Sequence, residues 1–259
     1  MVGFHPQGLD SDLKLTNSDT ILLDHYIAGD INLSNYEDKL GDSFTRAKGG
    51  SEADLRLQTA IFRYVKYVAK RLEIDIVLMD LGPNLGALNR AIISGSDYFI
   101  MPVSVDLFSL KGVENLGEKL LIWNREWKQL NESLGEEIGI DIPQGQPIFL
   151  GYVVQQHNIR KNRKEGITQG WEIFMKQLEP TVKENIVDKL LPLGQVIQRK
   201  EYKLGNIPNL HSLIPYALDA RKPVFDCTSR DGLNGAHITR ARESRAYFDG
   251  IIKEIIQIV

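Results

Sequence analysis

The clearest pattern of hydrophobic and polar positions lies between residues 75 and 89, where the chain reads DIVLMDLGPNLGALN. Residues 76–79 form an unbroken apolar run that ends in a single acid, Asp80. A turn sequence, GPNLG at 82–86, follows at once and leads into a helix-like segment. A continuous apolar run bounded by turn residues is typical of a strand buried on both faces of a parallel sheet. This stretch therefore predicts a strand, a loop and a helix.

Similar patterns along the rest of the chain predict an alternation of strands and helices. Strands are predicted at 20–26, 97–103 and 147–154, and a last short one at 196–197. Amphipathic helices are predicted at 52–73, about 109–130, 167–190 and 236–258. Such alternation favours an α/β fold with a doubly wound, mostly parallel sheet. Residues 1–19 are predicted as a polar tail or linker, and 20–259 as a single domain.

Three local features refine these predictions. Ser34 and Glu37 have the spacing of a capping box, which predicts Ser34 as the N-cap of a helix. Pro180 falls inside a helical segment, so we expect the helix to end or kink there. Trp123 and Trp127 lie four residues apart on a predicted helix, where they are expected in the core rather than in a ligand site.

Composition narrows the class of protein. The 259 residues are 42% hydrophobic and 25% charged, as is usual for a globular protein. The formal net charge is -3, so nucleic-acid binding would need a local basic patch. One cysteine allows neither a disulfide framework nor a cysteine-rich metal site. There is no signal-peptide pattern at the amino terminus and no apolar stretch of about 20 residues, so we expect a cytoplasmic protein without a membrane span.

Asp80 is the first candidate functional residue. A carboxylate at the carboxyl end of a buried strand lies where open α/β sheets bind their ligands. The alternative is that Asp80 only caps the helix that follows, because Asp favours that position. The sequence around residue 80 leaves both interpretations open.

Several blocks of sequence resemble, in the right order, the ParA/MinD class of deviant-Walker ATPases, the partition and cell-positioning members of the P-loop NTPases. They are DLGPNLGALNRA from Asp80, DYFIMPVSVD from Asp97, FSLKGVENLG from Phe108, GYVVQQ from Gly151 and SLIPYALDARKPVFD from Ser212. The similarity covers most of the chain from about residue 22. It implies a ParA/MinD-like P-loop NTPase fold, ATP and Mg²⁺ as cofactors, and ATP-dependent dimerisation that positions DNA or other cargo.

The phosphate-binding loop of that family, KGGxGK[ST], has no counterpart in this sequence. Such a loop needs glycines whose N–H groups wrap the phosphates, a Lys for their oxygens and a Ser or Thr on Mg²⁺. No Gly-Lys-Ser or Gly-Lys-Thr occurs, and KGGSEA from Lys48 and GVENLG from Gly112 are predicted as a loop and as helix interior. We therefore expect the fold to lack its first strand–P-loop–helix unit. Whether the chain is an ATPase, and hence an enzyme, stays open.

The resemblance assigns roles to residues of the predicted strand ends. Asp80 matches a catalytic carboxylate that holds the water shell of Mg²⁺ or the attacking water, and Gly82 would bring its N–H close to the γ-phosphate. Gln156 and His157 are candidates for the rim of the base site, although a polar loop is an equally good interpretation of them. The candidate cofactor-binding residues are Gly82, Pro83, Asn84, Gln156 and His157.

Basic residues gather near residues 160–164, near 198–203 and at the start of the last helix. Such groups can neutralise phosphates, although most basic clusters are solvated surface. Because ParA-like proteins bind DNA non-specifically, the resemblance favours a DNA-binding role and an association with the nucleoid. The candidate DNA-contacting residues are Lys161, Arg163, Lys164, Arg199, Lys200 and Arg240.

The missing unit also affects the expected partners. In the family, the phosphate-loop strand lies inside the sheet beside the strand that carries Asp80. Without it, the apolar strand would present an unpaired edge, which invites association with another chain. We expect a homodimer or a partner chain, together with a ParB-like stimulating partner. Three hypotheses follow: a ParA-like ATPase without hydrolysis in this chain alone, a pseudo-ATPase scaffold, and a non-specific nucleic-acid-binding module.

Overall fold

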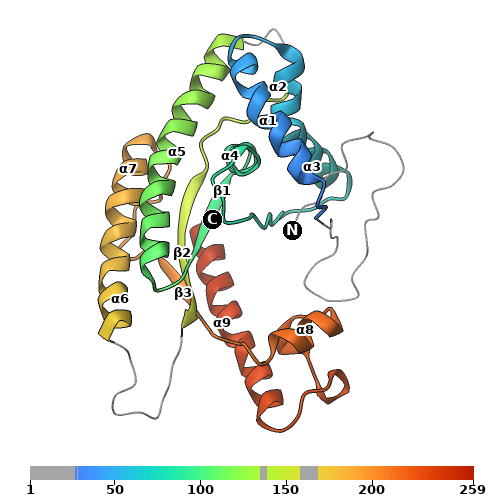
Figure 1. The fold of residues 1–259 in the computed structure, drawn as a ribbon, viewed down its shortest axis with the longest axis vertical. Coiled ribbons are helices and arrows are strands. Elements are labelled where there is room, and N and C mark those ends of the chain that lie inside the picture. The colour runs from blue at the N-terminus through green and yellow to red at the C-terminus, as the bar shows by residue number, and fades with distance from the viewer. Residues whose placement is uncertain (1–26, 28, 135–138, 158–168) are drawn as a thin grey trace. The chain divides into compact units, whose positions relative to one another are not determined.

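A computed structural model describes residues 27, 29–134, 139–157 and 169–259 of the protein (Figure 1). The chain divides into two compact units: unit 1 comprises residues 1–97 and 119–147, and unit 2 comprises residues 98–118 and 148–259. The described elements combine helices with a parallel sheet, which confirms the predicted α/β class. That residues 20–259 form a single domain stays a prediction.

Unit 2 contains a three-stranded parallel sheet in the order β1-β2-β3. The strands are β1 (Tyr98–Val103), β2 (Ile148–His157) and β3 (Lys203–Pro208). Tyr98 pairs with Ile148 and Val103 with Val154, and the register shifts once between Phe99 and Ile100. The predicted strands at 97–103 and 147–154 are confirmed. The short strand predicted at 196–197 is reduced to an isolated bridge between Val196 and Phe149, and β3 was not predicted.

Helices lie on both sides of this sheet. In Figure 1, α6 (Gln169–Val182) and α7 (Asp188–Leu190) lie on one side, and α9 (Ala236–Ile258) lies on the other. Ile251 of α9 packs against Val153 and Leu204 of the sheet. Gly205 permits this approach, because a Cβ there would lie 2.7 Å from Ile251 Cγ1. This arrangement is the helix-covered parallel sheet of an α/β protein.

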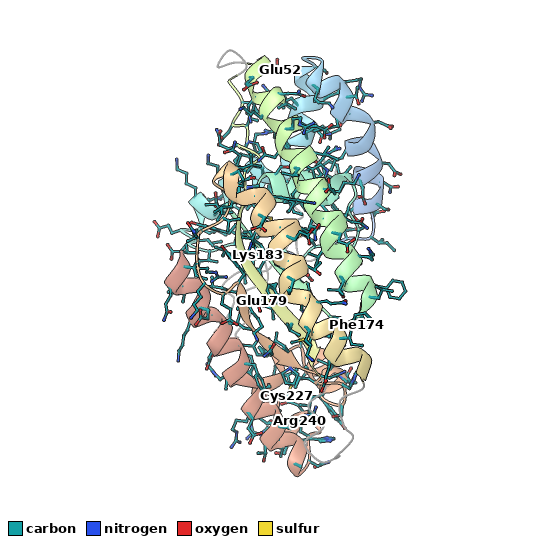
Figure 2. The ribbon with its side chains drawn as sticks, turned by 90° about the vertical axis from the view of Figure 1, so that its left-hand side faces the viewer. Glu52, Phe174, Glu179, Lys183, Cys227 and Arg240 are labelled. Carbon is teal, nitrogen blue, oxygen red and sulfur yellow. The ribbon has the colours of Figure 1, made fainter. Side chains whose placement is uncertain are left out.

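The remaining elements of unit 2 are short, except for the start of α5 (Leu107–Leu134), which continues in unit 1. They are the π-helical turn η2 (Lys183–Val187), η3 (Leu191–Leu193), α8 (Ile214–Ala220), η4 (Val224–Asp226) and η5 (Ser229–Asp231). The helix continues through Pro180, and the π-helical turn follows it within one turn (Figure 2). A proline inside a helix removes a backbone donor, and the irregular turn comes directly after the helix that contains it.

The described elements of unit 1 are helical: α1 (Leu33–Lys48), α2 (Glu52–Gln58), α3 (Ala60–Arg71), α4 (Ala87–Ser94) and the rest of α5. The single helix predicted at 52–73 is wrong, since two helices meet at Thr59. The Thr59 hydroxyl donates to Leu55 O and accepts from Arg63 Nε, so it fills the break between them. Trp123 and Trp127 are buried as predicted, and Trp127 packs with Phe44, Ala47, Leu55 and Leu130.

Two predictions for unit 1 are wrong at the level of local structure. α1 begins at Leu33 with Asn32 as its N-cap, so Ser34 is not the capping residue. Residues 76–79 form no strand. The side chains of Ile76, Val77 and Leu78 are 72%, 41% and 73% exposed. An apolar run becomes a strand only beside another strand, and the described part of unit 1 offers none.

Gly151 offers a test of the sheet. It lies inside β2 at φ +142°, and a Cβ there would lie 2.3 Å from the backbone oxygen of Tyr202. We expect Gly151→Ala to lower the free energy of unfolding by about 2–4 kcal/mol, because neither the backbone angle nor the neighbouring carbonyl can adjust cheaply. The measurement is urea unfolding followed by circular dichroism.

The matched control is Gly112→Ala. Gly112 lies inside α5, and a Cβ there would meet nothing within 4 Å. Alanine is the better helix former by about 1 kcal/mol, so this variant should be as stable as the parent or more so. Equal unfolding midpoints for the two variants would contradict the close approach of β2 and Tyr202.

Candidate functional site

The loop between Asp80 and α4 is closed by one buried amide. Asn89 lies in the first turn of α4 and is only 4% exposed. Its Nδ2 donates to Gly82 O at 2.7 Å and to Asn84 O at 2.5 Å. Asn84 in turn accepts from Gly86 N through Oδ1 at 3.0 Å. These bonds fix the loop as a compact turn, and three predicted site residues, Gly82, Pro83 and Asn84, therefore lie together with Asp80 in one loop of unit 1.

Glu37 contacts the amino terminus of the helix that follows this loop. Its Oε1 accepts from Leu88 N at 3.4 Å, although the two residues lie on different helices, α1 and α4. Gly86, the N-cap of α4, permits the approach, because a Cβ there would lie 1.9 Å from Glu37 Oε1. A carboxylate is stabilised at a helix amino terminus by the free N–H groups and the helix dipole. Glu37, predicted to cap its own helix, instead satisfies a donor of α4.

Asp80 itself is exposed, and none of the described residues forms a hydrogen bond or an ion pair with it. The N-cap of α4 is Gly86, so the alternative that Asp80 only caps this helix is wrong. An exposed carboxylate fits a hydrated Mg²⁺ ion, which keeps several waters and takes one or two carboxylates from the protein. Asp80 could therefore hold such an ion through water, as the resemblance implies.

The same loop does not fit the phosphates of a nucleotide. Phosphate groups bind where backbone N–H groups and positive side chains are free. Here the carboxylate of Glu37 is bonded to the amino terminus of α4. Within the described ranges, hydrogen bonds and ion pairs join no lysine or arginine to residues 80–86. The loop thus offers a carboxylate as a ligand for the metal, while the described contact at the amino terminus of α4 comes from a second carboxylate, that of Glu37.

The remaining predicted nucleotide-site residues lie elsewhere. Gln156 and His157 are the last residues of β2, and His157 pairs with Pro208 of β3 through the backbone. Their side chains are outside the described part of the structure. They belong to unit 2, whereas Asp80 and its loop belong to unit 1. Their role at the rim of a base site stays a prediction.

The predicted DNA-contacting residues differ in exposure and in whether their side chains already form hydrogen bonds within the protein. Lys161, Arg163 and Lys164 lie outside the described residues. Arg199 donates from Nη2 to Leu150 O and to Tyr202 O, and burial lowers the pKa of its guanidinium. Lys200 is exposed. Arg240, labelled in Figure 2, is exposed near the start of α9. Its Nη2 donates to Asn209 O. Arg199 therefore ties β2 to the segment before β3, and its charge is already committed to two carbonyl oxygens.

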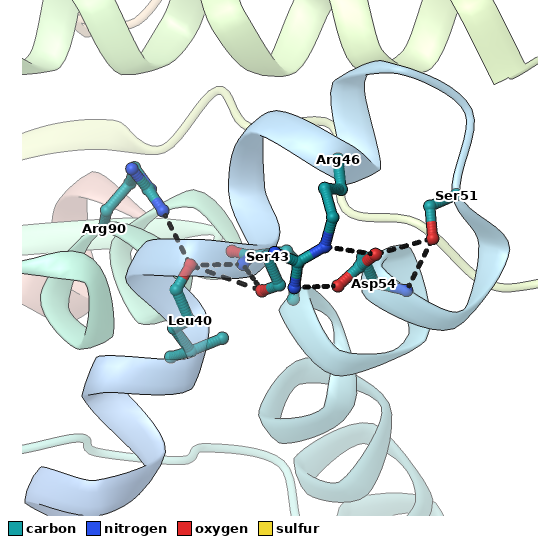
Figure 3. Close-up of polar contacts among 7 residues, drawn as sticks. Leu40, Ser43, Arg46, Ser51, Asp54 and Arg90 are labelled. Carbon is teal, nitrogen blue, oxygen red and sulfur yellow. Dashed lines mark hydrogen bonds and ion pairs between the residues drawn. The ribbon is translucent and has the colours of Figure 1, made fainter.

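A second polar group, missed from the sequence, anchors α4 on α1. The guanidinium of Arg90 lies 3.5 Å from the centroid of the Phe44 ring, and its Nη2 donates to Leu40 O at 3.5 Å. Gln58 Nε2 donates to the same carbonyl at 2.7 Å and Ser43 Oγ at 3.4 Å, so several donors converge there (Figure 3). Burial lowers the pKa of Arg90, which leaves the guanidinium charged but poorly hydrated.

Beside it, α1 and α2 are joined by a bidentate ion pair, also shown in Figure 3. Arg46 Nε and Nη2 donate to the two carboxylate oxygens of Asp54 at 3.0 and 2.7 Å, and Ser51 Oγ donates to Asp54 Oδ2 at 2.6 Å. The hydrogen bonds from Arg46 and then Ser51 hold the pKa of Asp54 below its usual value. These contacts fix the helices around α4 and are structural in character.

Metal-binding clusters and membrane-spanning helices are both absent from the described part of the chain. No group of three or more His, Cys, Asp and Glu side chains there could hold a metal ion by itself. None of the helices described is both long and apolar enough to cross a membrane.

Comparison with known proteins bears on the family and the fold. Residues 12–134 match the model of a family described as an AAA domain, which is a ParA/MinD-type P-loop ATPase domain. A search of the curated proteins found no match. Among solved structures, protein DIP2308 from Corynebacterium diphtheriae is similar with a TM-score of 0.54 and 21% identity, over 74% of this chain and 61% of that one. This chain thus spans less than two thirds of that structure, and at this identity the likeness concerns the fold. The chain has a P-loop NTPase-like α/β fold, and its residues 12–134 are similar to an ATPase domain of this type.

Proposed function

We propose that this chain is a ParA-like partition or positioning protein that acts through dimerisation, or through a partner chain, and that it does not hydrolyse ATP by itself. The likeness of residues 12–134 to a ParA/MinD-type domain supports the class. The absence of ATP hydrolysis is supported by one contact: the carboxylate of Glu37 is bonded to the amino terminus of α4, directly after the Gly82–Gly86 loop. It puts negative charge where a polyphosphate would need positive charge.

The chemistry of phosphoryl transfer explains why the contact between Glu37 and α4 supports a chain without turnover. Catalysis there is almost entirely positioning and neutralisation of charge on the phosphate oxygens. Asp80 could hold the water shell of Mg²⁺, but a carboxylate repels phosphate unless the metal lies between them. The sequence contains no Gly-Lys-Ser or Gly-Lys-Thr to supply the remaining charge. We infer that a nucleotide, if held, serves as a signal for association.

The partners follow from the same proposal. A positioning protein of this class would bind a second copy or a partner chain, DNA without sequence preference, and a ParB-like stimulating protein, inside the cytoplasm and on the nucleoid. Of the proposed DNA contacts in the described chain, Lys200 is the one whose side chain is exposed and forms no hydrogen bond or ion pair with another described residue. Arg199 would contribute to the sheet rather than to DNA.

The first test is phosphate release from Mg-ATP by the purified chain. We expect a rate indistinguishable from that of Asp80→Ala, because the sequence holds no Gly-Lys-Ser or Gly-Lys-Thr to place a lysine on the γ-phosphate. The two proteins should be purified in parallel, so that a contaminating ATPase contributes equally to both. Turnover that disappears in Asp80→Ala would refute the proposal.

A second test concerns the shape of the loop. Asn89→Ala removes two donors from Gly82 O and Asn84 O, so it should lower the free energy of unfolding by about 1–3 kcal/mol and speed amide hydrogen exchange at 82–88. Asn131→Ala is the matched control. It removes one comparable bond, to Pro143 O at 3.2 Å, in the same unit. The control should leave exchange at 82–88 unchanged, and equal exchange in both variants would show that Asn89 does not hold the loop.

A further inference from the structure

An apolar segment of unit 1 is left without cover. Ile76 and Leu78 are 72% and 73% exposed, and Val77 is 41% exposed. The neighbouring side chains on the carboxyl side, Met79 and Leu81, pack against the core cluster built on Leu40 and Ile61. The segment is therefore anchored at one end and presents consecutive apolar side chains to solvent. Monomeric proteins seldom expose such a patch unless something binds there.

The backbone of this segment has no hydrogen-bond partner among the described residues. No backbone hydrogen bond joins residues 75–81 to the rest of the described chain. Residues of this apolar, partly β-branched type favour extended structure. A stretch that offers free N–H and C=O groups together with apolar side chains binds other chains by strand addition.

The negative charges at the two ends of the segment indicate which kind of chain could pair with it. Acids stand at both ends of the apolar run, Asp75 and Asp80, and both are exposed. If two copies paired through this run, each in-register parallel pair would put Asp75 opposite Asp75 and Asp80 opposite Asp80. A centred antiparallel pair would put Asp75 opposite Asp80. Like charges directly opposite each other destabilise a pair of strands, so a second copy is disfavoured in both arrangements.

We propose that residues 75–81 are a docking site for an extended segment of another polypeptide, apolar in the middle and basic at both ends, which pairs with them as a β-strand. The basic ends would meet Asp75 and Asp80, and the apolar middle would cover Ile76 and Leu78. This inference goes beyond the proposed function and requires no nucleotide. Peptide binding is measured without nucleotide, so a negative result would overturn this inference and leave the proposal on ATP turnover untouched. Likewise, ATP turnover by the chain would overturn the proposed function and leave the docking site untouched.

The test uses two capped hexapeptides that share the core Val-Ile-Val-Ile, one with a lysine and the other with a glutamate at each end. Fluorescence anisotropy with the full chain should show the basic peptide binding at least about tenfold more tightly at low salt, with a preference that shrinks as salt is added. Hydrogen exchange at 75–81 should slow when the basic peptide is bound. Equal affinity of the two peptides, or binding of neither, would overturn the proposal.

Three variants separate strand pairing from non-specific adhesion. Leu78→Pro removes a backbone donor at an exposed position and should abolish peptide binding. Ile31→Pro is the matched control, because Ile31 is an apolar residue of the same unit, 90% exposed and just before a helix, where proline is tolerated; it should bind as the parent does. Asp75→Lys should reduce the preference for the basic peptide. A dimer in sedimentation that Leu78→Pro dissociates would identify a second copy as the occupant and refute the proposal.

Discussion

β2 has a hydrogen-bonded neighbour on each side, and unit 2 is built on that pairing. Each buried backbone group needs a partner, and a central strand satisfies this need along its whole length. The same requirement explains the contrast with residues 76–79. Their side chains are as apolar as those of β2, yet they form no strand, because the described part of unit 1 provides no strand to pair with. In this chain, an apolar run forms a strand where another strand is available to pair with it, and apolar composition alone is not enough.

The parts of the fold that follow from local pattern were predictable. β1 and β2 are built on apolar runs, and α9 carries Ile251, Ile252, Ile255 and Ile256 at helical spacing. Both Trp123 and Trp127 are buried as expected. β3 was missed because KLGNIP carries a charge, a glycine and a proline, and lacks alternation. The break at Thr59 was missed because the apolar period continues across it, while the bonds from Gln58 to Leu40 O and Ser43 Oγ reach residues far away in the sequence.

The same distinction applies to the candidate site. The run from Asp80 to Asn84 was recognisable, since a lone acid followed by Gly-Pro-Asn after an apolar run has a local signature. Glu37 and Asn89 had no such signature. Glu37 had a capping-box spacing with Ser34, but its carboxylate serves a helix that begins fifty residues later, at Ala87. Asn89 looks like an ordinary helical residue until the two carbonyls it binds are placed around it. Contacts between distant residues leave no periodic trace in the sequence.

The electrostatics of unit 1 connect the loop with the exposed segment before it. Asp75, Asp80 and Glu37 all carry negative charge there, and among the described residues no hydrogen bond or ion pair brings a lysine or arginine to residues 75–86. Within the described residues, the segment has no backbone hydrogen-bond partner and the loop has no lysine or arginine bonded to it. A strand with basic ends would correct both at once, because pairing with residues 75–81 would carry its basic residue to the position beside Asp80.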